Sequence, residues 1–263
     1  MPFFSLTTKY LLALVAICVI SSAHGAADNK PTGTGRVYGV LSLIGDRLDI
    51  VVALLPAGAS MDPNRRESIL VEEAVFDDTV LGAMVAAVRK VTPNAELASL
   101  NTRSPVLFEK HRTLFEESAN TIAIPEAIRD ALKAQGATHL FLITKRRDEA
   151  SALLDDVIIE GRGKLEGLGF YLDSAIETRD AASGRTGRGY LAPYAFFDIR
   201  LIDLANSTVV ARRKVVDAWP VSIGVSAAGA AGMWGALSAG NKVRLVNELI
   251  KREISRLVPE MLR

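Results

Sequence analysis

The patterned part of the chain begins with two apolar runs that are typical of β-strands. Val37–Ile44 and Leu48–Leu55 are rich in β-branched and other apolar residues, and Gly45-Asp46-Arg47 separates them. A short, glycine-containing break between two such runs is typical of a tight turn. The pattern therefore predicts a β-hairpin over residues 37–55.

A second hairpin is predicted nearer the C-terminus. Tyr194–Leu201 and Thr208–Val216 flank a polar turn at Asp203–Ser207. Apolar and charged side chains alternate in the first of these strands, with Phe197, Ile199 and Leu201 set against Asp198 and Arg200. Because successive side chains of a strand point to opposite faces, one face is expected to be buried and the other to be exposed to water.

The clearest local signal is a helix, a glycine and an apolar strand in succession. Pro125–Gln135 has helical spacing, Gly136 is a typical C-terminal stop, and Ala137–Lys145 is almost continuously apolar. Such a run is typical of a strand that is buried on both faces in a sheet covered by helices.

Other segments complete an α/β pattern. Further amphipathic helices are predicted at Thr79–Lys90, from Pro105 through Phe115, and from Asn241 to about Leu257. Further strands are predicted at Ile69–Phe76, Glu96–Leu100 and Leu165–Leu172. We therefore expect an α/β fold, with a mixed β-sheet that contains hairpins and is covered by amphipathic helices.

The domain organisation follows from where these patterns begin and stop. Residues 26–35 combine Pro, Gly and Thr without an apolar face, so they are expected to be a flexible leader. Residues 36–263 are expected to form a single domain. Within it, the segment at about 174–190 loses its apolar content, which predicts a mobile loop insertion.

Residues 1–25 have the pattern of a cleaved secretory signal peptide. Lys9 precedes the apolar stretch Tyr10–Ile20, and small residues follow it, so cleavage is expected before Ala26. The alternative is a membrane anchor, but this stretch is shorter than the roughly 20 residues that a spanning helix needs. Cys18 lies inside the stretch and lacks the context of a lipid-modified cysteine.

Composition and charge narrow the compartment and the partners. The chain is 49% hydrophobic, and its single cysteine lies in the signal segment. An exported chain without disulfides suits a bacterial periplasm. Removing residues 1–25 takes away one of 31 basic residues and none of the 30 acidic ones, which leaves a net charge of zero. We therefore expect no nucleic-acid partner and no transmembrane span in the mature chain.

Common reactive motifs are absent from the sequence. The mature chain has only His111 and His139 as histidines and has no cysteine pair, so no metal is expected. His111 lies on an apolar stripe, which favours a packed or partner-facing role. Gly224–Ala228 lacks the second glycine of a nucleophile elbow, and no phosphate-loop motif is complete. We expect no cofactor.

The predicted loop provides the candidate partner site. Aromatic residues flank it and arginines lie within it, and both residue types are frequent in protein interfaces. The candidates are Phe170, Tyr171, Tyr190 and Tyr194 together with Arg179, Arg185 and Arg188. The alternative is a disordered insertion whose aromatic residues pack into the sheet.

A second candidate contact is the segment 221–240, which has no charged residue and is rich in Gly and Ala. Three interpretations are open: a close-packed helix of small residues, a loop that covers the sheet, or a contact with a partner or membrane. Trp234 would be the anchor in the third.

The strand GATHLFLITK and the hairpin FFDIRLIDLANSTVVARRKVVDAW, followed by a terminal helix, resemble known periplasmic α/β modules. These are the modules of the curli-secretion lipoprotein, of the lipoprotein activators of penicillin-binding proteins, and of the N-terminal domain of the Tol-system translocation protein. The resemblance implies a binding or assembly module and transfers no site residue. The chain also resembles exported proteobacterial proteins that have no assigned activity.

The sequence thus favours a non-catalytic periplasmic module that binds a protein or a cell-envelope component. One alternative is a small-ligand receptor or enzyme whose site is assembled from scattered residues. Another is a membrane-associated assembly subunit that uses residues 221–240. The oligomeric state is left open.

Overall fold

The computed structural model describes residues 36–54, 64–71, 74–154, 157–179, 186–221 and 229–263. The predicted signal peptide, its cleavage site, Cys18 and the leader lie outside these residues. The described chain forms one curled, mixed sheet of eleven strands together with five helices. The predicted α/β class is confirmed.

The sheet contains most of the chain. The strands are β1 (Val37–Leu43), β2 (Arg47–Val52), β3 (Arg65–Leu70), β4 (Glu96–Leu100), β5 (Glu117–Ser118), β6 (Thr121–Ile122), β7 (His139–Lys145), β8 (Arg147–Leu154), β9 (Val157–Arg179), β10 (Thr186–Asp203) and β11 (Thr208–Ala218). The helices are α1 (Val75–Val91), α2 (Pro105–Leu114), α3 (Glu126–Ala134), α4 (Gly229–Gly235) and α5 (Ala239–Met261).

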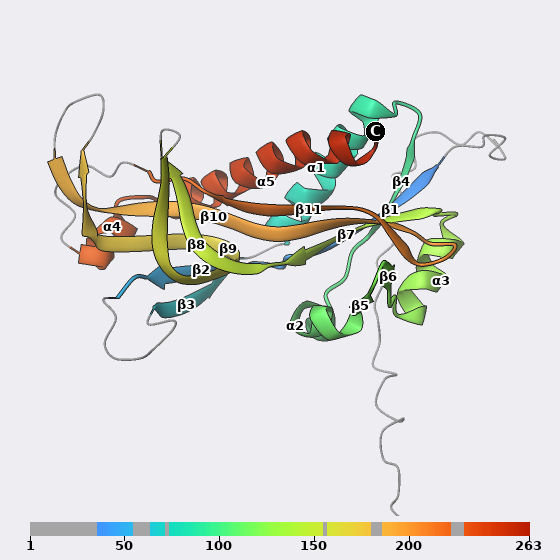
Figure 1. The fold of residues 1–263 in the computed structure, drawn as a ribbon, viewed down its shortest axis with the longest axis horizontal. Coiled ribbons are helices and arrows are strands. Elements are labelled where there is room, and N and C mark those ends of the chain that lie inside the picture. Colours follow the sequence, from blue (N-terminus) through green and yellow to red (C-terminus); the bar gives the residue numbers. More distant parts are fainter. Residues whose placement is uncertain (1–35, 55–63, 72–73, 155–156, 180–185, 222–228) are drawn as a thin grey trace, which may run out of the picture.

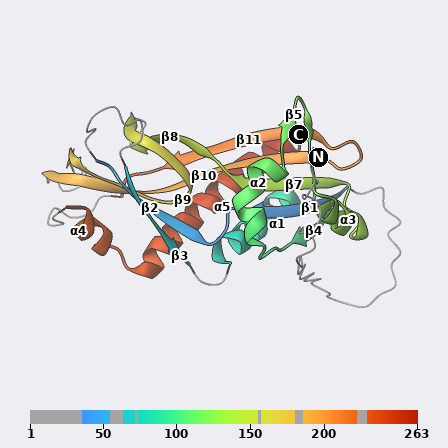
Figure 2. The same ribbon diagram turned by 90° about the horizontal axis from the view of Figure 1, so that it is seen from below.

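The helices cover the two faces of the sheet unequally. Figures 1 and 2 show the long helices α1 and α5 on one face, and α2, α3 and the short strands β5 and β6 on the other. The larger apolar core lies between the sheet and the pair α1 and α5, and includes Phe141, Phe197 and Ile250. A smaller core lies beneath α2 and α3.

Strands β4, β1 and β7 are parallel, and β1 lies between the other two. Parallel neighbours require crossover connections, which α1 provides between β1 and β4 and which α2 and α3 provide between β4 and β7. Leu140 through Ile143 of β7 are fully buried, which confirms the predicted two-sided burial of this strand.

The predicted hairpin at residues 37–55 is wrong. β1 is parallel to β7 and β2 is parallel to β9, while both β7 and β9 are antiparallel to β10. β1 and β2 therefore run in the same direction and do not pair with each other. Gly45, at a φ of 70°, bends the chain between them without reversing it. The partners of β2 are β9 and β3.

The predicted loop at about 174–190 is also wrong. Residues 174–179 belong to β9 and residues 186–190 to β10, and the two strands pair, with Arg188 opposite Glu177. Only residues 180–185 of the segment lie outside the described chain. The polar composition led to an incorrect prediction of a loop. The β9–β10 ladder is held by hydrogen bonds between backbone groups, and these can form whatever the polarity of the side chains.

Most of the other predicted elements are present. The hairpin of β10 and β11 and the four amphipathic helices are confirmed. The predicted strand Ile69–Phe76 is only partly right, because β3 ends at Leu70 and Phe76 lies in α1, where its side chain is fully buried. The predicted single domain stays a prediction.

Candidate functional site

The four aromatic residues predicted to flank a partner site lie in the interior. Phe170, Tyr171, Tyr190 and Tyr194 are each at most 2% exposed. Phe170 belongs to the core beneath α1 and α5, whereas the three tyrosines belong to a cluster on the other face. They cannot form an exposed contact surface in this fold. The alternative, in which these aromatics pack into the sheet, describes their placement correctly.

The predicted arginines lie on strands or outside the described chain, and Trp234 packs against the core. Arg179 and Arg188 lie on the paired strands β9 and β10, and Arg185 lies outside the described residues. Trp234, on α4, packs edge-on against Phe170 with 5.5 Å between ring centroids, and the Lys242 ammonium lies 3.9 Å from its ring centroid. These contacts support the internal-packing interpretation for residues 229–235; residues 222–228 lie outside the described chain.

The most exposed regular element among the described residues is β3. It lies at the end of the sheet and, within the described part of the chain, pairs only with β2. All six of its residues are exposed, including Ile69 at 37% and Leu70 at 64%. In contrast, Leu48, Ile50 and Val51 of the adjacent β2 are buried. The unpaired backbone N–H and C=O groups along an open edge are a template for another strand.

Several bonds hold β3 in place. The backbone N–H of Val71 donates to the carbonyl of Asp46 at 2.7 Å, and the Ser68 hydroxyl donates to Asp49. The side chains of Asn64 and Arg66 reach across to carbonyl groups of β9. Because inward and outward peptide groups alternate in an antiparallel ladder, the Val71 bond places the peptide groups of Ser68 and Leu70 on the outer side.

The other long edge of the sheet has different chemistry. β11 pairs with β6 only at Thr208, so most of its outer side is open. However, Arg212, Arg213 and Lys214 follow one another along it. Consecutive charges are a common protection of an edge against strand addition. β3 also has consecutive charges, Arg65, Arg66 and Glu67, but they lie at the start of the strand, whereas those of β11 lie in its middle. The uncharged second half of β3, with Ile69 and Leu70 exposed, is therefore the edge better suited to receive another chain.

The charged face of β10 is not simply exposed to water, contrary to the prediction for Asp198 and Arg200. Asp198 is buried, and three arginines and three acidic residues form a network around it. The members are Arg146, Arg200, Arg212, Asp148, Asp198 and Glu117. Asp198 accepts from Arg146 at 3.3 Å, and Arg200 donates to Thr144 at 2.9 Å. The charges balance within the network, which links β10 to β5, β7, β8 and β11.

A partly buried carboxyl lies at the bend between β1 and β2. Asp77, in the first turn of α1, accepts a hydrogen bond from the Ser42 hydroxyl. Burial raises the pKa of Asp77 to about 7, although bonds from Ser42 and from the backbone N–H groups of Gly45 and Ile44 act in the opposite direction. This group therefore titrates near neutral pH.

The histidine singled out in the sequence is packed in the interior. His111 is buried on α2, with Nδ1 2.9 Å from the carbonyl oxygen of Phe108. Nε2 is buried too and has no hydrogen-bond partner among the described residues. In the same part of the chain, no group of three or more His, Cys, Asp or Glu side chains is placed to hold a metal ion. None of the described helices combines the length and apolar composition of a membrane span.

No protein-family model and no curated protein matches the sequence. Three solved structures are similar over most of the chain, at 10–13% identity. Protein XCC0632 of Xanthomonas campestris, of the DUF330 family, is 13% identical, with coverage of 86% of this chain and 83% of that one and a TM-score of 0.36. Protein CT253 of Chlamydia trachomatis is 10% identical, with coverage of 87% and 98% and a TM-score of 0.35.

The third structure is the PelC dodecamer of Paraburkholderia phytofirmans, 10% identical, with coverage of 84% of this chain and 86% of that one and a TM-score of 0.27. Likenesses this distant carry no argument about function. None of the three structures comes from the periplasmic families that the sequence resembles, so that resemblance stays a prediction.

Sequence reasoning did not find the β3 edge. Residues 65–70 read RRESIL, in which four polar or charged residues precede two apolar ones without alternation. A weak signal was present, since the adjacent apolar residues Ile69, Leu70 and Val71 do not alternate with polar ones, as they would in a strand that buries one face.

Proposed function

We propose that this protein is a non-catalytic interaction module of the bacterial cell envelope, and that it binds an extended segment of another protein as an added strand on β3. The observation that supports this best is the open outer side of β3, where Ile69 and Leu70 remain exposed although the strand is firmly hydrogen-bonded to β2. Strand addition of this kind is a recurrent mode of peptide recognition.

The chemistry of the edge suits an extended chain. Outward peptide groups at Ser68 and Leu70 would supply backbone hydrogen bonds to the incoming strand. Ile69 and Leu70 point to opposite faces, so each would contact an apolar side chain of the added strand. Ile69 lies opposite Leu48 in the ladder, next to the main core. An apolar residue added there would extend an existing cluster.

Export to the periplasm is part of the same proposal. It is supported by the signal-like residues 1–25 and by a mature sequence without cysteine.

A pair of matched double substitutions tests the binding mode. Ile69→Lys with Leu70→Lys places two charges on the β3 edge, and Val210→Lys with Val216→Lys places two charges on exposed positions of β11. Proteins captured from an envelope extract by crosslinking should be retained by the wild-type and β11 variants and lost with the β3 variant. Circular dichroism would verify that both variants are folded.

Two results would contradict this proposal. If the β3 variant captures the same proteins as the wild type, strand addition at β3 is wrong. If the species lost is a second copy of this chain, the edge is a self-association surface, and the proposal of another protein as the partner fails.

A further inference from the structure

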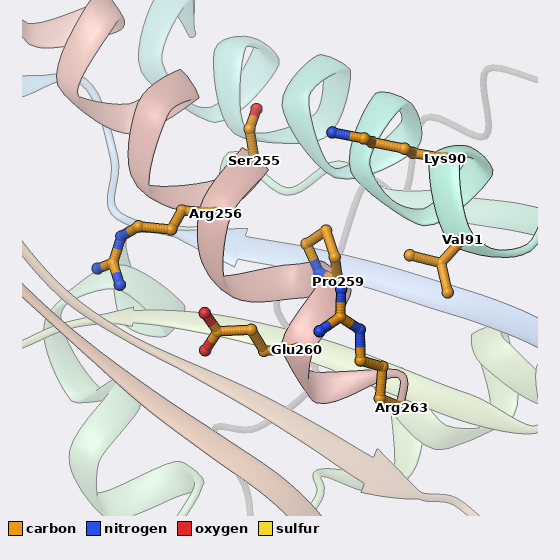
Figure 3. A pocket seen from close by; sticks show the side chains of 7 residues that line it. All are labelled: Lys90, Val91, Ser255, Arg256, Pro259, Glu260 and Arg263. Carbon is orange, nitrogen blue, oxygen red and sulfur yellow. The ribbon is translucent and has the colours of Figure 1, made fainter.

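A groove lies between the C-terminal ends of α1 and α5, well away from β3. Its volume is about 450 Å³, which is within the range of small-molecule sites. The two helices run in the same direction, because Thr79 of α1 lies 3.0 Å from Asn247 of α5 and, further toward the C-terminus of both helices, Lys90 and Ser255 line the same groove. The lining residues are Lys90, Val91, Ser255, Arg256, Pro259, Glu260 and Arg263 (Figure 3).

Two of the charged side chains that line the groove are neutralised by neighbours. Arg256 donates to Glu253, and Glu260 pairs with Arg213 of β11 at 3.5 Å. Figure 3 shows both side chains directed to the same side of α5. These two residues therefore contribute little net charge to the groove.

The other two cations are different. Neither Lys90 nor Arg263 has an ion-pair partner among the described residues. In Figure 3 the Lys90 ammonium is directed toward Ser255, and the Arg263 guanidinium lies beside Pro259. The groove thus presents two cations that have no ion-pair partner among the described residues, a hydroxyl group and an apolar surface from Val91 and Pro259.

Cations near helix C-termini also offset the helix dipoles, a role that needs no bound ligand. A helix end carries roughly half an elementary negative charge. Arg89, in the last turn of α1 but outside the groove, already offsets the end of that helix. Lys90 and Arg263 therefore add two further positive charges near these helix ends.

We propose that this groove binds the phosphate group of a small amphiphilic phosphate monoester. A phosphate monoester carries about −1.5 to −2 charges at neutral pH, which matches the two free cations. Arg263 can donate two parallel hydrogen bonds and Lys90 a further one, and Ser255 can donate from its hydroxyl. The apolar part of the ligand lies against Val91 and Pro259. The site is independent of the β3 edge.

Calorimetric titration of the mature chain at low salt, with inorganic phosphate and octyl phosphate as probes, tests the site. Octyl phosphate should bind more tightly than inorganic phosphate because of the contact with Val91 and Pro259. Lys90→Gln with Arg263→Gln should weaken octyl phosphate about tenfold, as expected for two exposed ion pairs, and added salt should reduce the difference.

The matched control removes two other positive charges, one from α1 and one from α5, outside the groove. Arg89 and Lys251 are exposed and do not line it. Arg89→Gln with Lys251→Gln should leave the affinity within about twofold, since only screened, more distant charge is lost. Equal weakening by both double variants would show nonspecific charge attraction and would overturn the site, as would the absence of octyl phosphate binding to the wild-type chain.

A second arm identifies the source of the phosphate group. Vesicles of phosphatidylcholine with and without phosphatidic acid are mixed with the wild-type chain and with the two double variants. Binding that needs phosphatidic acid and is lost only in the groove variant assigns the site to a lipid headgroup. Octyl phosphate binding without vesicle binding assigns it to a soluble phosphate ester.

Discussion

At the scale of single residues, position in the fold changes the chemistry of side chains that look ordinary in the sequence. Asp77 and Asp78 are adjacent acidic residues at the start of a helix. Asp78 is exposed, whereas Asp77 turns toward Ser42 and the bend after β1. Burial makes the charged form of Asp77 less favourable, and its pKa is about 7.

Asp77→Asn should change how stability depends on pH. The folded-state pKa lies above the unfolded value of about 3.9, so the folded chain holds a proton that the unfolded chain releases between about pH 4 and 7. The free energy of unfolding of the wild type should therefore fall over this range, by no more than about 4 kcal/mol and by less where Asp77 contacts solvent. The stability of the variant relative to the wild type should rise over the same range.

Urea unfolding at several pH values measures this difference. Asp78→Asn removes a neighbouring charge from the same helix turn and serves as the control, with a nearly constant difference from the wild type. Parallel curves for the wild type and Asp77→Asn would contradict the assignment.

At the scale of the elements, the long strands β9 and β10 depend on close backbone approach. A Cβ on Gly169 of β9 would lie 2.6 Å from the hydroxyl oxygen of Tyr194 on β10 and would collide with the carbonyl of Asp49 on β2. Gly169 is thus the point at which three strands come together. In contrast, a Cβ on Gly82 of α1 would meet nothing within 4 Å.

These two glycines predict opposite effects of the same substitution. Gly169→Ala should destabilise the protein by about 3 kcal/mol, because neither the Asp49 carbonyl nor the fully buried Tyr194 can move freely. Gly82→Ala should stabilise it by about 0.5–1 kcal/mol, since alanine is the better helix former and space is open. Chemical denaturation of both variants measures the pair, and a neutral Gly169→Ala would mean that the three strands are less tightly packed.

At the scale of the whole molecule, the arrangement places two candidate contact regions far apart in the fold. The open edge of β3 lies at one end of the sheet, and the basic groove lies at the C-terminal ends of α1 and α5. A protein segment and a phosphate monoester would therefore not compete for the same atoms. The neutral network around Asp198 stabilises the middle of the sheet.

Export is a property of the whole chain and has its own test. Intact-mass analysis of protein recovered from the periplasm should give a mature chain that begins near Ala26, because Lys9, the apolar stretch after it and the small residues before Ala26 form a cleavable signal. A chain that retains Met1, or a lipid mass on Cys18, would contradict this prediction.

The sequence alone determined four of the five described helices and most of the described strands. Periodicity is a local property, so α1, α2, α3, α5, β7 and the hairpin of β10 and β11 could be read from residues that are close together in the chain. The same applies to the packed position of His111, which follows from its place on an apolar stripe. No local pattern indicated the groove, because Lys90 and Arg263 are far apart in the sequence.

Only the tertiary structure decided which strands pair and what each face meets. β1 and β2 look like a hairpin, but each finds a parallel partner from the distant strands β7 and β9, and the bend at Gly45 allows both pairings. The polar segment at 174–190 becomes part of a ladder because backbone hydrogen bonds do not depend on side-chain polarity. The pairing of the strands also decides which side chains are buried. Tyr171 and Tyr194 are buried and Ile69 is exposed, because the surroundings of a strand are set by residues that are distant in sequence.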